Sequence, residues 1–411
     1  MPGHEFFTTL TVAQALHGFR PTRRTAAETV ALADALHRVP AEAVTATSAL
    51  PGFARATVDG FAVRAADTYG VSDGQPGYLD VNGTVAMGRA PTVAVVPGTA
   101  VAVPTGGALP QGADAVVMVE HTQEAMPGTI EVVHPVAPGD GMVRADEDAA
   151  PGALLAPAGR PLRPHDLGLL AAAGVTSVSV WARPVVGILS TGDEVVPPGT
   201  ATLRPGQVRD ATACALAGLV TEHGGTPQIR GIVPDDAPAL DAALREAVAT
   251  CDLVVVSAGS SVGARDETAS VVSGLGPPGV FCHGLAIRPG KPTLLAECGG
   301  VPLIGLPGHP LSALVVFRLV GLPVLHRLGG CVAPPPEPRV RARLSRQVAS
   351  AAGRLDVVQV RLSSGASVDA EPILGHSALL SLLAAADGYV VVPEAATGLT
   401  AGTEVMVSLY R

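Results

Sequence analysis

The sequence is poor in several residue types, and each scarcity narrows its possible function. Among 27 basic residues there is a single lysine, Lys291, and there is also a single asparagine, Asn82. Charged residues make up 15% of the 411 positions and aromatic residues only 3%. Acidic residues outnumber basic ones by 36 to 27, which gives a net charge of −9. This balance argues against an extended nucleic-acid-binding surface, although local anion sites remain compatible with it.

Long apolar runs and paired cysteines are scarce as well. The most apolar run, residues 313–325, is interrupted by Arg318 and Pro323, whereas a membrane span needs about 20 apolar residues. Residues 1–7 contain no basic residue, so no signal peptide is predicted. The five cysteines lack Cys-x-x-Cys spacing, which argues against a disulfide framework and a zinc site. We therefore expect a cytoplasmic protein with reduced thiols and no membrane partner.

Residues 1–180 are expected to form a mixed N-terminal region. Residues 11–14 carry a capping-box pattern that predicts a helix start, and the apolar spacing over 30–36 predicts a second helix. After Pro51 the sequence changes to short apolar alternations separated by Gly and Pro. These alternations predict a β-rich subdomain inserted at about 53–137, with strands near 60–63, 78–85, 99–104 and 115–120.

Residues 181–330 alternate between strand-like and helix-like segments. Apolar stretches at 185–189, 228–233 and 253–256 are followed by Gly-rich or acidic turns, and Asp210 and Asp236 stand at predicted helix starts. Such alternation predicts a doubly wound, mostly parallel sheet with helices on both faces. Ligands of such sheets bind beyond the carboxyl ends of the strands.

A proline-rich segment, residues 332–338, predicts a stiff linker after the α/β region. Residues 331–411 return to strand-like alternation and predict a small C-terminal β-rich domain. The expected fold class is therefore multidomain α/β plus β. A central doubly wound domain at 181–330 is flanked by the mixed N-terminal region and by the C-terminal β domain.

Two loops of small residues follow predicted strands of the central region. In the first, the backbone N–H groups of Ser260, Ser261 and Gly263 are able to approach a phosphate at a helix N-terminus. The second runs through Pro307 and Gly308 to Ser312, whose hydroxyl and N–H suit an anion at the start of another helix. Taken singly, each loop fits an ordinary strand-to-helix turn equally well.

Two cations lie between these loops. Arg288 and Lys291 stand three residues apart in Arg-Pro-Gly-Lys-Pro, where two prolines restrict the backbone. This arrangement suits a clamp for a polyanion. In a sequence that uses Arg almost everywhere, a retained lysine indicates a site that needs a compact ammonium rather than a planar guanidinium.

Four acidic residues stand at predicted strand-to-helix junctions on the same edge of the sheet: Asp193, Glu194, Asp210 and Asp266. Asp210 and Asp266, considered singly, fit plain helix N-caps. As a set facing two cations and two small-residue loops, the four acids suit a Mg²⁺–phosphate site. Two more acids, Asp59 and Asp148, lie far away in the sequence, where a turn and a solvated charge run are the simpler explanations.

Taken in order, these motifs resemble the molybdopterin molybdenumtransferase family, MoeA, whose eukaryotic relative is the E domain of gephyrin. The resemblance covers nearly the whole chain and rests on eight segments in the same order: 51–53, 57–63, 110–118, 143–148, 190–194, 260–266, 288–292 and 305–308. It implies that molybdate is inserted into adenylylated molybdopterin with release of AMP and with the help of Mg²⁺.

The resemblance also implies an elongated homodimer and a role for each motif. Asp59 and Asp148 of one subunit would meet the α/β domain of the other and act there with Glu194, Asp266 and Lys291. The implied substrate-binding residues are Ser260, Ser261, Gly263, Arg288, Pro307, Gly308 and Ser312. The implied metal ligands are Asp193, Glu194, Asp210 and Asp266. A molybdopterin adenylyltransferase is a further possible partner.

Some motifs depart from the family pattern. Phe61 replaces a common Tyr, Thr212 replaces Asn, Arg288 replaces Lys, and His309 replaces Asn or Tyr. The carboxylates and the second cation are retained, so the resemblance implies an active enzyme. The alternatives are a non-catalytic molybdopterin-binding or scaffold paralogue and a molybdopterin adenylyltransferase.

Overall fold

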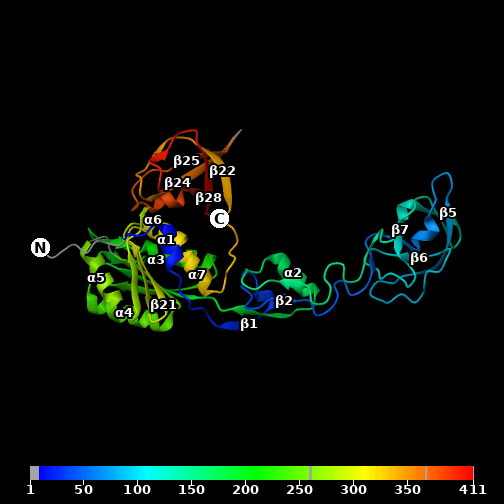
Figure 1. Ribbon diagram of the computed structural model, residues 1–411, viewed down its shortest axis with the longest axis horizontal. Coiled ribbons are helices and arrows are strands. Elements are labelled where there is room, and N and C mark those ends of the chain that lie inside the picture. The colour runs from blue at the N-terminus through cyan, green and yellow to red at the C-terminus, as the bar shows by residue number, and fades with distance from the viewer. Residues whose placement is uncertain (1–8, 259–261, 366–367, 411) are drawn as a thin grey trace.

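A computed structural model describes residues 9–258, 262–365 and 368–410 of the chain. The molecule is elongated (Figure 1). An α/β domain and a β-rich C-terminal domain lie at one end, a small domain containing α2 (Pro164–Ala172) lies in the middle, and a second β-rich domain lies at the far end. We refer to these parts as the central domain, the C-terminal barrel, the arm domain and the distal domain.

The central domain is built on a six-stranded sheet in the order β16-β13-β17-β21-β20-β18. The first four strands are parallel to one another. β20 runs antiparallel to its neighbour β21, and β18 runs antiparallel to β20. This arrangement confirms the predicted doubly wound, mostly parallel sheet, and the three predicted strands all lie within it. The strand bounds are β13 Val185–Thr191, β16 Thr226–Val233, β17 Leu253–Ala258, β18 Pro278–His283, β20 Leu294–Cys298 and β21 Val301–Pro307.

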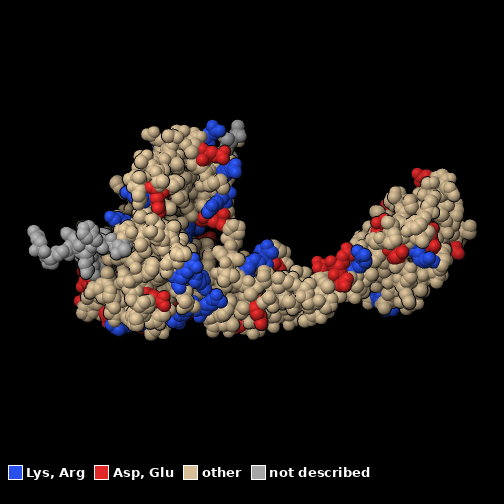
Figure 2. Space-filling view, viewed as in Figure 1, with Lys and Arg blue, Asp and Glu red and all other residues tan. Residues whose placement is uncertain are grey.

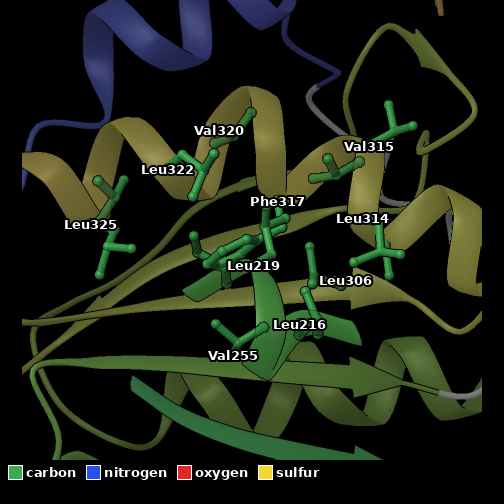
Figure 3. Close-up of a cluster of buried hydrophobic side chains, with 14 of the residues drawn as sticks. Leu216, Leu219, Val255, Leu306, Leu314, Val315, Phe317, Val320, Leu322 and Leu325 are labelled. Carbon is green, nitrogen blue, oxygen red and sulfur yellow. The ribbon is translucent and has the colours of Figure 1, made fainter. Parts of the chain in front are cut away.

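Helices cover both faces of this sheet, and each face has its own core. On one face, Leu216 and Leu219 of α3 (Ala211–Glu222) pack with Phe317, which points from its helix toward the sheet (Figure 3). The other face is covered by α4 (Ala237–Thr250) and α5 (Val262–Ser273). The helical segment carrying Phe317 comprises α6 Pro310–Val316, η4 Phe317–Gly321 and α7 Leu322–Leu328.

Residues Pro310–Leu328 form the one helix in the described part of the chain that is long and apolar enough to cross a membrane. Because 72% of its most apolar window is buried, it has the placement of a core helix. The first helix, α1 (Val12–Gly18), packs on the same face of the central sheet through Val12 and Ala15. Its predicted capping box, between Thr11 and Gln14, is confirmed.

The arm domain pairs β1 (Ala27–Ala31) with β12 (Ser177–Trp181), and β2 (Val44–Thr45) with β11 (Leu154–Ala156). The helix predicted over 30–36 is wrong. Val30 lies opposite Val178 in the β1–β12 ladder, and the chain then makes only a single 3₁₀ turn, η1 (Leu32–Asp34). The pairing partner lies almost 150 positions away in the sequence, so a local apolar spacing does not reveal it.

The distal domain is a six-stranded sheet in the order β7-β4-β6-β5-β9-β8, with a core on each face. The four predicted strands are confirmed, although the last one ends at Met118 and continues as the 3₁₀ turn η3 (Val119–His121). The connection to the arm domain contains the pair β3 (Arg55–Ala56) and β10 (Met142–Val143). The sheet strands are β4 Gly60–Val63, β5 Gly77–Thr84, β6 Thr99–Val103, β7 Ala115–Met118, β8 Thr122–Met126 and β9 Thr129–Val132.

The C-terminal domain closes into a small barrel, because β24 pairs with both β25 and β26. A short strand of the central region, β19 (Ile287–Arg288), adds to β24 in parallel. The predicted β-rich C-terminal domain is thus joined by strand pairing to the Arg288–Lys291 loop. The barrel strands are β22 Arg339–Leu344, β24 Leu355–Ser364, β25 Val368–Pro372, β26 Gly388–Val392 and β28 Glu404–Leu409.

The remaining elements are short. They are η2 Ala65–Thr68, β14 Val195–Val196, β15 Val208–Arg209, β23 Val348–Ala349, α8 Leu380–Ala384 and β27 Gly398–Leu399.

Candidate functional site: a cationic cleft between two domains

A cleft of about 850 Å³ separates the central domain from the C-terminal barrel. The central domain supplies the loop 285–292 and the turn 307–312, and the barrel supplies residues from 348–359 and 373–377. Arg288, Lys291 and Arg354 line it, with His309 and His376. Asp356 is the one carboxylate among the lining residues that the structure describes. The cleft is therefore net positive and suits an anionic ligand.

The loop that carries Arg288 and Lys291 is held tightly against the central domain. Gly290 has a φ of +126°, and a Cβ added there would lie 2.4 Å from Cγ2 of Val316 in α6, so only glycine fits. The backbone oxygen of Lys291 accepts a 2.8 Å hydrogen bond from the Leu285 N–H. The Lys291 side chain is exposed, and so is 64% of the Arg288 side chain. Both cations thus project from a fixed backbone.

The turn after β21 forms the second wall of the cleft. Pro307 ends the strand, Pro310 begins α6, and Ser312 lies in the first turn of that helix, 4% exposed and lining the cleft. His309 lies at the N-cap position without a side-chain cap, and its Nδ1 atom is 2.8 Å from Oγ of Ser377 in the barrel. The structure therefore brings Arg288, Lys291, Pro307, Gly308 and Ser312 together around one cavity.

The acids of the central domain lie outside the lining of this cleft. Asp193 is exposed and accepts a 3.2 Å hydrogen bond from the Asp235 N–H. Glu194 is half-buried and folds back over Gly192, where a Cβ would lie 2.6 Å from the Glu194 Oε2 atom. Asp210 is 7% exposed and has both oxygens engaged, by the Ala213 N–H at 3.0 Å and by the Ser190 hydroxyl at 2.7 Å. Asp210 is thus the N-cap of α3.

Some of the predicted substrate-binding and metal-binding residues lie wholly or partly outside the residues that the structure describes. Ser260 and Ser261 lie outside the described residues, and so does the side chain of Asp266, whose backbone is in α5 together with Gly263. No three His, Cys, Asp or Glu side chains of the described chain come close enough to hold a metal ion. Mg²⁺ commonly binds one or two carboxylates together with substrate phosphates. Exposed Asp193 and half-buried Glu194 fit that mode better than the engaged carboxylate of Asp210.

Asp59 and Asp148 do not reach the cleft of their own chain. Asp59 directly precedes β4 of the distal domain, and Asp148 lies where the arm leads toward that domain, its N–H bonded to the Leu50 oxygen. Both are exposed. In Figure 1 the distal domain and the cleft domains stand at opposite ends of the molecule, and Figure 2 shows acidic side chains gathered on the thin connection before the distal domain.

The carboxylate of Asp59 is nevertheless held by hydrogen bonds within its own domain. It accepts hydrogen bonds from the Thr105 N–H at 2.7 Å and from the Thr105 hydroxyl at 2.9 Å, and these bonds lower the pKa of Asp59 below its ordinary value. The next residue, Gly60, is required by a close approach, since a Cβ there would lie 2.0 Å from the Val117 oxygen. The Val-Asp-Gly motif thus holds an ionised, solvent-facing carboxylate at a fixed place.

The barrel wall of the cleft was missed by sequence reasoning. Arg354, Asp356, His376 and Ser377 all line the cavity, yet they stand in no motif that predicts a ligand site. Their part in the cleft depends on β24 pairing with β19. The only sequence signal available was the cationic Arg354 next to a strand-like run.

The sequence matches three consecutive family descriptions over most of its length. Residues 10–174 match the "MoeA N-terminal region (domain I and II)", residues 187–327 a "probable molybdopterin binding domain", and residues 341–410 the "MoeA C-terminal region (domain IV)". This chain belongs to the MoeA family. The eight-motif resemblance is thereby confirmed.

Full-length relatives agree with membership of the MoeA family. A molybdopterin molybdenumtransferase from Bacillus subtilis is 33% identical over 404 residues, covering 93% of this chain and 90% of the relative. Molybdopterin molybdenumtransferase 2 from Mycobacterium tuberculosis is 32% identical over 402 residues, covering 96% of each. The crystal structure of a molybdopterin biosynthesis MoeA protein from Pyrococcus horikoshii matches with a TM-score of 0.85 and 30% identity, covering 98% of this chain and 100% of that one. The predicted MoeA-type fold class is therefore confirmed.

Proposed function

We propose that this chain is a molybdopterin molybdenumtransferase, which inserts molybdate into adenylylated molybdopterin and releases AMP. The observation that carries the proposal is the cationic cleft, which Arg288 and the single lysine, Lys291, line together with the turn ending at Ser312. The names of the full-length relatives support the same activity.

The residues of the cleft match the charges of this substrate. Adenylylated molybdopterin carries a phosphoanhydride, and Arg288, Lys291 and Arg354 supply three cations to bind its phosphates and to stabilise the charge that develops on the leaving AMP. Ser312 adds a hydroxyl at the cleft wall. The Ser260–Gly263 loop and Asp266 are proposed to contact the same substrate from the adjoining α5 edge.

Mg²⁺ is proposed as the cofactor, and Asp193 and Glu194 would hold it together with substrate phosphates. When bound, Mg²⁺ supplies positive charge that neutralises the phosphoanhydride oxygens. Asp210 is proposed to act in the same region chiefly through its cap of α3, which fixes the start of that helix beside β13.

We further propose that the active form is a homodimer in the cytoplasm. Asp59 belongs to the distal domain and Asp148 to its connection with the arm, and the distal domain stands at the opposite end of the molecule from the cleft domains (Figure 1). A symmetric pair would deliver both residues to the cleft of the other subunit. An adenylyltransferase that supplies the adenylylated substrate is a possible further partner.

The test is AMP release by the purified chain supplied with adenylylated molybdopterin, molybdate and Mg²⁺. We expect molybdate-dependent AMP release and transfer of the product to an apo-molybdoenzyme. Asp59→Asn and Asp266→Asn should fold normally and lose nearly all turnover, because each keeps the side-chain size and removes the charge. Nucleotide binding without molybdate-dependent release would identify a scaffold. Adenylation of molybdopterin from ATP would identify an adenylyltransferase.

A further inference from the structure

One buried carboxylate joins two arginines from different domains at the edge of the cleft. Asp356 in β24 is 4% exposed. Its Oδ1 accepts a 2.8 Å hydrogen bond from Nε of Arg354 and its Oδ2 one of 3.4 Å from Nη2, so the pair is bidentate. The same Oδ2 lies 3.7 Å from Nη1 of Arg288, which belongs to the central domain.

The backbone fixes this arrangement. Arg288 lies directly opposite Asp356 in the parallel β19–β24 register, and the Leu355 N–H donates a 2.9 Å hydrogen bond to the Ala286 oxygen. The two guanidiniums remain accessible, with 64% of the Arg288 side chain and 35% of the Arg354 side chain exposed. Both arginines line the cleft. Each therefore has N–H donors left for a ligand after contacting Asp356.

We propose that Asp356 is a positioning residue that aligns Arg288 and Arg354 as one clamp for the substrate's phosphate groups, an inference that rests on the proposed function. A guanidinium loses considerable rotamer entropy when it binds, and a carboxylate that already holds it reduces that loss. Without Asp356, two like charges would face each other with no counter-charge between them and would turn apart into solvent.

Positioning and simple charge attraction predict effects of opposite sign. Asp356→Asn removes a negative charge from a cationic cleft, so long-range attraction alone would make an anion bind more tightly. If Asp356 orients the arginines, the same change weakens binding, because an amide has one acceptor oxygen and no charge to hold two guanidiniums. The direction of the change therefore decides between the two.

The experiment measures binding of AMP and, separately, of inorganic pyrophosphate to the full-length chain by calorimetry. For Asp356→Asn we expect Kd to rise about tenfold for both probes, the scale of one lost charge-assisted contact. The matched control is Asp369→Asn, half-buried on the neighbouring strand β25 and outside the cleft lining, which should leave both Kd values unchanged. In turnover, Asp356→Asn should raise KM more than it lowers kcat.

If Asp356→Asn fails to fold, Arg354→Lys replaces it, since lysine keeps the charge and loses the bidentate fork; Kd should again rise. Unchanged or tighter binding by the folded variants, or no binding of either probe by the wild type, would overturn the clamp. A wild type that binds AMP in the expected way but shows no molybdate-dependent turnover would instead overturn the proposed function and leave the clamp standing.

Discussion

The Nδ1 atom of His309 lies 2.8 Å from the Oγ atom of Ser377, so the turn after β21 contacts the C-terminal barrel within the lining of the cleft. His309→Ala and Ser377→Ala should each raise KM severalfold with little effect on kcat, because both remove the same contact between the two walls of the cleft. A double-mutant cycle should give a coupling energy of about 0.5–1.5 kcal/mol, the net value of one such hydrogen bond. Fully additive effects would show that the contact does not act in binding.

Lys291 is predicted to be required as an ammonium. Lys291→Arg keeps the charge and replaces a compact donor by a planar fork on a loop that Gly290 fixes against Val316. We expect a loss of about 1–3 kcal/mol in kcat/KM. The matched control is the opposite exchange, Arg343→Lys, at an exposed position of β22 outside the cleft lining, which should be neutral. Wild-type turnover by Lys291→Arg would refute a functional lysine.

Asp210 is predicted to stabilise the central domain as a helix cap. Asp210→Ala removes the acceptor of both the Ala213 N–H and the Ser190 hydroxyl at a buried site, and should lower the free energy of unfolding by about 1–2 kcal/mol. Asp210→Asn keeps a capping oxygen and should retain most of that stability. Chemical denaturation checks both values, and equal stability of all three proteins would argue against the cap.

A half-buried histidine pair predicts a stability loss in mild acid. Burial lowers the pKa of both His223 and His326 from 6.5 to about 4, and their rings lie 5.6 Å apart. Between these pH values the unfolded chain binds protons that the folded chain does not, so the free energy of unfolding falls as the pH drops from about 6.5 toward about 4.

Denaturation at a series of pH values measures this slope. The double substitution of His223 and His326 by Gln should flatten it, because the folded and unfolded states then differ by two fewer titrating groups. His165→Gln, at an exposed position of α2, is the control and should leave the slope unchanged. A slope that is as steep in the double variant as in the wild type would place the acid sensitivity elsewhere.

Much of the central domain is predictable from the sequence, because its signals are local. The β-branched run at β17 and the caps at Asp210 and Asp236 are encoded within a few residues of each element. The strand at β1 was missed for the opposite reason: its partner β12 lies far along the chain, and only the paired ladder makes Val30 extended.

The candidate site likewise has one part that local sequence signals predict and another part that depends on pairing between distant segments. The Arg288–Lys291 loop and the Pro307–Ser312 turn carry distinctive Pro and Gly spacings, and the structure brings them to one cavity. Arg354, Asp356 and Ser377 carry no such spacing. They enter the cleft only because β24 of the barrel pairs with β19, which is a tertiary event between segments about 70 positions apart.

In the proposed homodimer, the cleft of one chain is completed by the distal domain of another. Asp59→Asn and Lys291→Ala chains, each expected to be inactive alone, are mixed one to one under conditions that exchange subunits, and molybdate-dependent AMP release is measured. Half of the random dimers are then mixed, and each mixed dimer has one intact site, so we expect recovery of about a quarter of wild-type activity. No recovery, despite demonstrated subunit exchange, would contradict it.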